Sequence, residues 1–152
     1  MRFEYELTGA GWSRARIQDD VAGAEITASY LSDALRDLLD AVAEIAAGAD
    51  AARCAWDEEP GEFRFIFERN GHEMRMSILW FDELWGGQPD EAGTPVFETR
   101  QTIDVLARAV HGAAAQVLED WGQEGYLEKW IEAPFPTDAL ARLTDALPRW
   151  ER

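Results

Sequence analysis

The chain begins with three short segments in which apolar and polar residues alternate. Phe3, Tyr5 and Leu7 alternate with charged residues, and a weaker alternation follows at residues 12–18 and 24–28. Glycines and aspartates separate the three segments and mark turns. Because a period of two places every second side chain on the same face of a strand, the pattern predicts three consecutive strands with one buried face each.

Apolar residues then recur at spacings of three and four, which is the period of an amphipathic helix. The first such stripe covers residues 30–47, and Ser29 or Ser32 could cap its start. A second stripe covers residues 102–121. Shorter helices are expected at 126–131 and after the Pro-Phe-Pro break that follows.

The segment between the two long helices contains a strong hairpin signal. Asn70-Gly71 predicts a two-residue turn, because both residues tolerate a positive φ. All apolar partners then share one face, so the turn and the hydrophobic pattern predict the same register. The predicted pairs are Arg69 with His72, Phe67 with Met74, Phe65 with Met76 and Phe63 with Ile78.

Two further strands flank this hairpin, one before the turn at Pro60-Gly61 and one that contains Val96 and Phe97. The resulting order is β-β-β-α-β-β-β-β-α-α-α. It predicts an α+β fold in which helices cover one face of a largely antiparallel sheet. The length of 152 residues favours a single domain over residues 1–152.

The alternation breaks down in the segment SILWFDELWGG, residues 77–87. The hairpin register points Trp80 toward the helices, so Leu79 and Phe81 face the other way. Together with Trp85 they form an apolar cluster that is covered either from within the chain or by a partner or second copy. Three aromatic residues near the C-terminus could provide the internal cover: Tyr126, Trp130 and Phe135.

The chain is strongly acidic, with 30 Asp and Glu, 14 Lys and Arg and a formal net charge of −16. This charge disfavours nucleic acid and anionic membranes as partners and favours basic ones. No apolar run approaches the ~20 residues that cross a bilayer, and the N-terminus lacks an apolar signal segment. With one cysteine, no internal disulfide can form, and we expect a cytoplasmic protein.

The sequence contains no catalytic motif. Cys54 falls on the predicted core face, and the two histidines, His72 and His111, lie far from it in the sequence. Such a set does not form a recognisable nucleophile or zinc site. The glycine pairs lack the lysine and the spacing of phosphate-binding loops. We therefore expect no catalytic residue, no metal and no cofactor, and the sequence favours a function other than catalysis.

Carboxylates at spacings of four, three and four line one face of the first predicted helix. At about 100° per residue they fall within roughly 60° of arc. The four are Asp33, Asp37, Asp40 and Glu44, and an acidic loop at Asp57, Glu58 and Glu59 could extend them. This surface is either a solvated outer face or one that steers a basic partner.

Four stretches resemble a family of uncharacterised small acidic bacterial α+β proteins. They are EITASYLSDALRDLL (25–39), FRFIFERNG (63–71), ILWF (78–81) and YLEKWIEAPFP (126–136). The family has no assigned activity, so the resemblance implies a fold but no functional residues. In its size, acidity and predicted fold class the chain is also similar to the immunity proteins of bacterial toxin systems, which block basic toxins.

The leading hypothesis is a non-enzymatic acidic binding protein that acts through protein–protein contact, as an immunity-like inhibitor of a basic partner. Phe81 or Trp85 would anchor the partner. In the alternative, the chain is a small-molecule-binding domain or an enzyme with an aromatic-lined pocket. Four side chains would line that pocket: Trp80, Trp85, Tyr126 and Trp130. A homodimer that pairs Leu79 and Phe81 across a two-fold axis is the third hypothesis.

Overall fold

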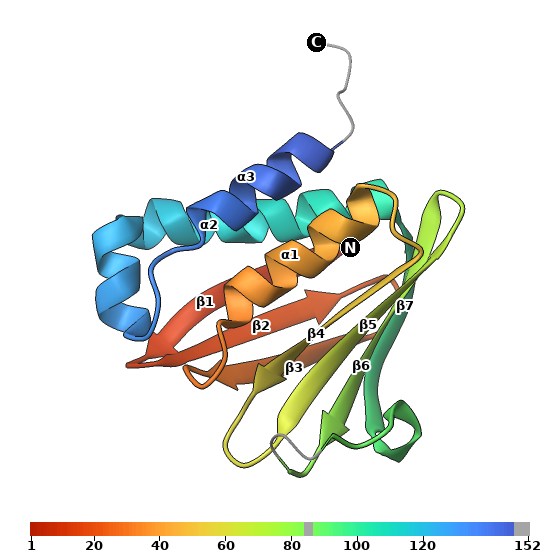
Figure 1. Cartoon of the computed structure of the whole chain (residues 1–152), viewed down its shortest axis with the longest axis horizontal. Helices are drawn as coiled ribbons and strands as arrows, with labels where there is room; N and C mark the ends of the chain where they lie inside the picture. The colour runs from red at the N-terminus through yellow and green to blue at the C-terminus, as the bar shows by residue number, and fades with distance from the viewer. Residues whose placement is uncertain (84–86, 148–152) are drawn as a thin grey trace.

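The computed structural model describes residues 1–83 and 87–147 and shows an α+β fold (Figure 1). The first half contains β1 (Arg2–Gly9), β2 (Trp12–Gln18), β3 (Gly23–Ser29) and α1 (Ala34–Ala46). The second contains β4 (Ala51–Asp57), β5 (Glu62–Asn70), β6 (Glu73–Phe81), the short 3₁₀ helix η1 (Asp90–Ala92), β7 (Thr94–Thr102), α2 (Ile103–Trp130) and α3 (Thr137–Ala146). The predicted fold class is confirmed. The two helices expected at 102–121 and 126–131 are segments of α2, which breaks at Gly122, where φ is 67° and ψ is 175°.

The strands of the described residues form two antiparallel meanders, β1-β2-β3 and β4-β5-β6-β7, rather than one sheet. The chain leaves the first meander through α1, so β4 begins a new sheet. Hydrogen bonds join the two sheets near β3. The Ser29 hydroxyl donates to the backbone carbonyl of Asp57 at 3.1 Å, and the Thr99 hydroxyl donates to the Asp19 carboxylate at 2.6 Å.

The three helices lie on one side of the sheets (Figure 1), and the buried face of each sheet packs toward them in one hydrophobic cluster. Trp56 connects the parts of this cluster that come from the two sheets and from α1. The Trp56 ring lies 5.7 Å from that of Tyr5 in the first sheet and 4.9 Å from that of Phe65 in the second. Its Nε1–H donates to the carbonyl of Ala34, the first residue of α1, at 2.9 Å. The two sheets and α1 therefore share a single core.

The hairpin between β5 and β6 differs from the predicted one by a register shift of two residues. Asn70 pairs with Glu73, and Phe67 pairs with Met76, so Gly71 and His72 form the turn. Gly71 has φ of 65°, whereas Asn70 does not have a positive φ. A II′ turn needs a positive φ only at its first central residue, which accounts for the shifted turn. An even shift keeps each side chain on its face.

Leu79 and Phe81 are buried from within the chain, but not by the predicted aromatic residues. Gly93 packs directly on them: a Cβ there would lie 2.6 Å from the Phe81 ring and 2.9 Å from Leu79 Cβ. On the same side the Arg64 guanidinium lies 4.0 Å from the centroid of the Phe81 ring and bonds to the Gln88 carbonyl at 2.8 Å. The segment before β7 thus closes this end of the sheet.

Tyr126, Trp130 and Phe135, which were expected to cover Leu79 and Phe81, lie instead at the far end of the helical layer. The rings of Tyr126 and Phe135 are 5.3 Å apart in an edge-on arrangement. The residues fill the corner between the distal part of α2 and the first sheet, where the carbonyl of Lys129 accepts from the backbone N–H of Gly11 at 2.9 Å. These three side chains therefore pack against the first sheet and not against the end of β6.

Candidate functional site

The acidic face of α1 is partly neutralised by arginines from α1 and α3. Arg142 donates to Asp40 at 2.6 Å. Arg36 pairs with Asp138 of α3 at 2.8 Å and with Asp33 at 3.3 Å. Two of the four predicted carboxylates, Asp33 and Asp40, are therefore held in ion pairs within the chain. The predicted stripe is one side of a helix–helix contact, rather than a freely exposed surface.

Beyond these ion pairs, α1 and α3 enclose a shallow groove with a volume of about 630 Å³. We call it the α1–α3 groove. Its lining residues are Asp40, Ala43 and Glu44 of α1, Ala47 directly after α1, and Arg142, Asp145 and Ala146 of α3. Alanines form its apolar lining, because their short side chains leave space between the helices. Three carboxylates and one arginine surround this lining.

The charge of the α1–α3 groove is available to a partner only in part. Asp40 and Arg142 neutralise each other, as described above. Glu44 and Asp145 are exposed, and their side chains make no ion pair or hydrogen bond to other described residues. An incoming cation would therefore meet two unpaired carboxylates beside an apolar lining. The sequence did not predict that Asp145 and the alanines belong to a binding site, although Ala43 and Ala47 follow Asp40 at helical spacing.

Asp37 lies on the other side of the stripe and is half-buried. Burial, followed by the nearby carboxylates of Asp33 and Asp40, raises the pKa of Asp37 from 3.8 to about 6. The charged form of this side chain is therefore destabilised in the folded state. Burial also raises the pKa of the neighbouring Cys54 thiol, which disfavours a thiolate nucleophile.

Replacing Asp37 by asparagine is expected to raise the free energy of unfolding by about 1 kcal/mol at pH 7, after a discount for partial exposure. The folded-state pKa of Asp37 lies above its unfolded-state pKa, so protonation of this side chain favours the folded state. The stability that this gives the wild-type chain is fully present below about pH 4 and is lost as the pH rises through about 6. The variant should lose this pH dependence in urea titrations. Glu44→Gln, at an exposed position of the same helix, is the control. Equal stability changes in both variants would contradict the assignment.

The acidic residues at the end of β4 and just after it have structural roles that the sequence did not reveal. Asp57 is buried, and its backbone N–H donates to the Ser32 hydroxyl at 3.0 Å. Glu58 is half-buried and accepts a hydrogen bond from Thr27. Glu59 alone of the three is exposed. The loop therefore joins the two sheets instead of simply extending the acidic face of α1.

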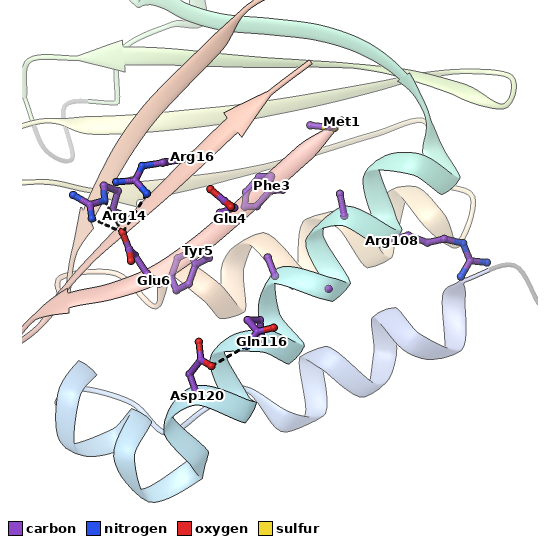
Figure 2. Close-up of a pocket in the computed structure, with 13 residues that line it drawn as sticks. Met1, Phe3, Glu4, Tyr5, Glu6, Arg14, Arg16, Arg108, Gln116 and Asp120 are labelled. Carbon is purple, nitrogen blue, oxygen red and sulfur yellow. Dashed lines mark hydrogen bonds and ion pairs between the residues drawn. The ribbon is translucent and has the colours of Figure 1, made fainter. Parts of the chain in front are cut away.

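A second groove, of about 550 Å³, lies between β1 and α2 (Figure 2). Its walls include Phe3 and Tyr5 on β1 and the small residues Ala109, Gly112 and Ala113 on α2. The basic residues of its lining are already paired. Arg14 and Arg16 pair with Glu6 and Glu25, and Arg108 donates to Asp104 at 2.8 Å. An anionic ligand would have to break these pairs, whereas the α1–α3 groove offers two unpaired carboxylates to a cationic one, so the α1–α3 groove is the better candidate.

The three described members of the predicted aromatic pocket, Trp80, Tyr126 and Trp130, do not come together. Tyr126 and Trp130 are fully buried, and Phe81 is only 2% exposed, so none of them can anchor a partner. Trp80 is half-buried, and its ring packs at a tilt against that of Phe63, with 4.8 Å between the centroids. It lies at the end of β6, far from the distal part of α2 (Figure 1). Trp85 lies outside the described residues. The fold places Trp80 apart from Tyr126 and Trp130, because the end of β6 and the end of α2 lie in different parts of the molecule (Figure 1).

Among the residues that the structure describes, no group of three or more His, Cys, Asp or Glu side chains could hold a metal ion. None of the described helices has both the length and the apolar character needed to span a bilayer. Comparison of the chain with protein-family models, curated proteins and solved structures finds no match.

Proposed function

We propose that this chain is a non-enzymatic binding protein that holds a basic protein partner in the α1–α3 groove. The observation that carries the proposal is the apolar lining of this groove beside the unpaired carboxylates of Glu44 and Asp145. A partner with lysine or arginine beside small apolar side chains fits that combination. By occupying the partner's basic surface, the chain would act as an immunity-like inhibitor in the cytoplasm.

Two electrostatic effects would contribute to this binding. The net charge of −16 attracts a basic partner over a distance of about one Debye length and raises the association rate. Once the partner is seated, Glu44 and Asp145 would form ion pairs at the edge of an apolar contact, where water is partly excluded. Burial of apolar surface between the alanines and the partner would provide affinity that salt does not screen.

Reversing both unpaired charges, Glu44→Lys with Asp145→Lys, is expected to weaken partner binding at least tenfold at low salt, because attraction is replaced by repulsion. The partner would first be captured from native lysate with the wild-type chain and then titrated by calorimetry at two salt concentrations. Equal affinity of the reversed variant would remove the groove from the proposal.

The matched control for this experiment is Glu119→Lys with Glu124→Lys, which makes the same change in net charge at exposed positions of α2. We expect this control to slow association slightly and to leave the dissociation rate unchanged. Equal losses in the two variants would show that net charge, rather than the groove, governs binding. If the wild-type chain retains no basic protein, the proposed function itself fails.

A small-molecule site is the second candidate function, and the groove between β1 and α2 is the observation that favours it. Its volume of about 550 Å³ falls within the range of roughly 300–1,000 Å³ typical of ligand pockets. A ligand there would shift the NMR signals of the Ala109 and Ala113 methyl groups. Unchanged methyl signals across a broad metabolite panel would count against this candidate.

A further inference from the structure

Strand β7 ends its sheet with one side open. Among the described strands, β7 is hydrogen-bonded only to β6, and Figure 1 shows it at the end of that sheet. An edge strand presents a row of backbone N–H and C=O groups with which another strand can pair. Pro95 removes one of these donors near the start of β7. The segment that is free to pair is therefore 96–102, between this proline and the start of α2.

Two opposite charges on this segment have no counterion within the sheet. Glu98 and Arg100 are exposed, and neither side chain forms an ion pair or a hydrogen bond with another described residue. Arg100 lies opposite Arg75 of β6, which already bonds to Glu68. Glu98 lies opposite the neutral Ser77. Strand β6 therefore gives Arg100 a like charge instead of a counterion.

A second copy of β7 would supply both counterions. When two identical strands pair antiparallel about a two-fold axis perpendicular to the sheet, the axis passes through one residue, and the positions before and after it face each other. With Thr99 on the axis, Glu98 of each copy faces Arg100 of the other copy. Opposite charges directly across two strands stabilise the pairing, whereas like charges destabilise it.

The length of the free segment selects the same axis. Thr99 is the midpoint of residues 96–102, so a pairing centred there uses the whole segment between Pro95 and α2. An axis through Glu98 would place two carboxylates opposite each other, and an axis through Arg100 would do the same with two arginines. Charge and length therefore specify one register.

The remaining pairs in this register are compatible with association. Val96, an apolar side chain that is 38% exposed, would lie beside Thr102 of the other copy, and Phe97 would lie beside Gln101. The net charge of −16 on each chain opposes the contact, because two acidic chains repel each other. The pairing is therefore expected to be weak and reversible.

We propose that β7 is the interface of a symmetric homodimer, in which two copies pair antiparallel through residues 96–102 with Thr99 on the two-fold axis. The second sheets of the two copies then form one continuous sheet. Their helical layers lie on the same side of it, because this axis preserves the faces of the strands. The interface is separate from the proposed partner binding, since no residue of β7 lines the α1–α3 groove.

Charge reversal with rescue tests this interface by sedimentation equilibrium. Glu98→Arg and Arg100→Glu are each expected to weaken dimerisation at least about tenfold, because two ion pairs become two repulsions. The two variants shift the net charge in opposite directions, so a loss in both does not come from net charge. The double variant Glu98→Arg with Arg100→Glu restores both pairs at the wild-type net charge and should dimerise within about threefold of the wild-type chain.

A wild-type chain that stays monomeric up to about 1 mM would overturn the proposal. A double variant that remains as weak as the single variants would also overturn it. Association that continues beyond a dimer would indicate a head-to-tail contact in place of the two-fold pairing, and would equally contradict it.

A cysteine on the axis checks the register independently of the charges. Residues directly opposite in an antiparallel pair have Cα atoms about 4.5–5.5 Å apart, a separation that a disulfide spans. Thr99→Cys is therefore expected to form a covalent dimer under mild oxidation. Thr94→Cys, an exposed position of the same strand before Pro95, is the matched control and should stay monomeric. Equal cross-linking of the two variants, or none in either, would refute this register.

Discussion

Replacing Trp56 by alanine is expected to lower the free energy of unfolding by about 3–5 kcal/mol, the usual range for a buried tryptophan. Trp56 is fully buried and contacts a ring from each sheet, Tyr5 and Phe65. Its removal leaves a cavity where the two sheets and α1 meet. The loss of the hydrogen bond to the Ala34 carbonyl adds to the cost, because that carbonyl loses its side-chain donor in the core.

Urea denaturation followed by circular dichroism measures this change, and Trp56→Phe separates its two causes. The phenylalanine variant keeps much of the apolar contact but loses the hydrogen bond, so it should cost about 1–2 kcal/mol. Trp121→Ala is the control at a 39% exposed tryptophan and should cost less than about 1 kcal/mol. Similar losses for Trp56→Ala and Trp121→Ala would show that Trp56 does not connect the sheets as described.

The strands and helices were predictable because their signals are local. Phe3, Tyr5 and Leu7 have a period of two that no helix would tolerate on a buried face, and each is buried in β1. The start of the first helix was less predictable. Ser32 was a candidate cap, but its hydroxyl accepts from the N–H of Asp57 in β4, so a long-range bond replaced the local one. Helix α1 begins at Ala34, after Asp33.

The register of the β5–β6 hairpin shows a second limit of sequence reasoning. A shift of two residues leaves every side chain on its original face, so the hydrophobic pattern cannot distinguish Phe67–Met74 from Phe67–Met76. Only the position of the turn fixes the register. Both possible turns, Asn70-Gly71 and Gly71-His72, contain a glycine, so the sequence does not distinguish them. The buried faces were therefore predicted correctly, whereas the pairs were wrong.

The candidate site was predictable only on one of its two sides. The spacing of Asp40 and Glu44 on α1 follows from helix geometry, but their neighbours on α3 are about a hundred positions later in the chain. Sequence spacing could not show that Arg142 would neutralise Asp40 or that Asp145 would stand beside Glu44. Consequently Asp40 and Glu44 were identified from the sequence, whereas Asp145 and the groove that gives Glu44 a proposed function were not.

Introducing a methyl group at Gly61 is expected to lower the free energy of unfolding by about 3 kcal/mol, at the upper end of the usual cost of overpacking. A Cβ at this position would overlap both the Phe81 carbonyl oxygen and the Trp80 ring. The carbonyl belongs to the backbone of β6, where Phe81 pairs with Glu62 of β5, and a backbone atom held in a sheet cannot turn aside as a side chain can. Gly93→Ala meets mainly the Phe81 ring and should cost less, about 1–2 kcal/mol, because a side chain can adjust.

Gly112→Ala provides a control of opposite sign for these two variants. Gly112 lies in α2, and a methyl group added there would meet no atom of another segment within 4 Å, so alanine should stabilise the chain by about 0.5–1 kcal/mol. If Gly61→Ala and Gly93→Ala are tolerated as well as Gly112→Ala, the segments around them do not close over Leu79 and Phe81. The apolar end of β6 would then be open, and pairing of two chains through Leu79 and Phe81 would again explain its sequence.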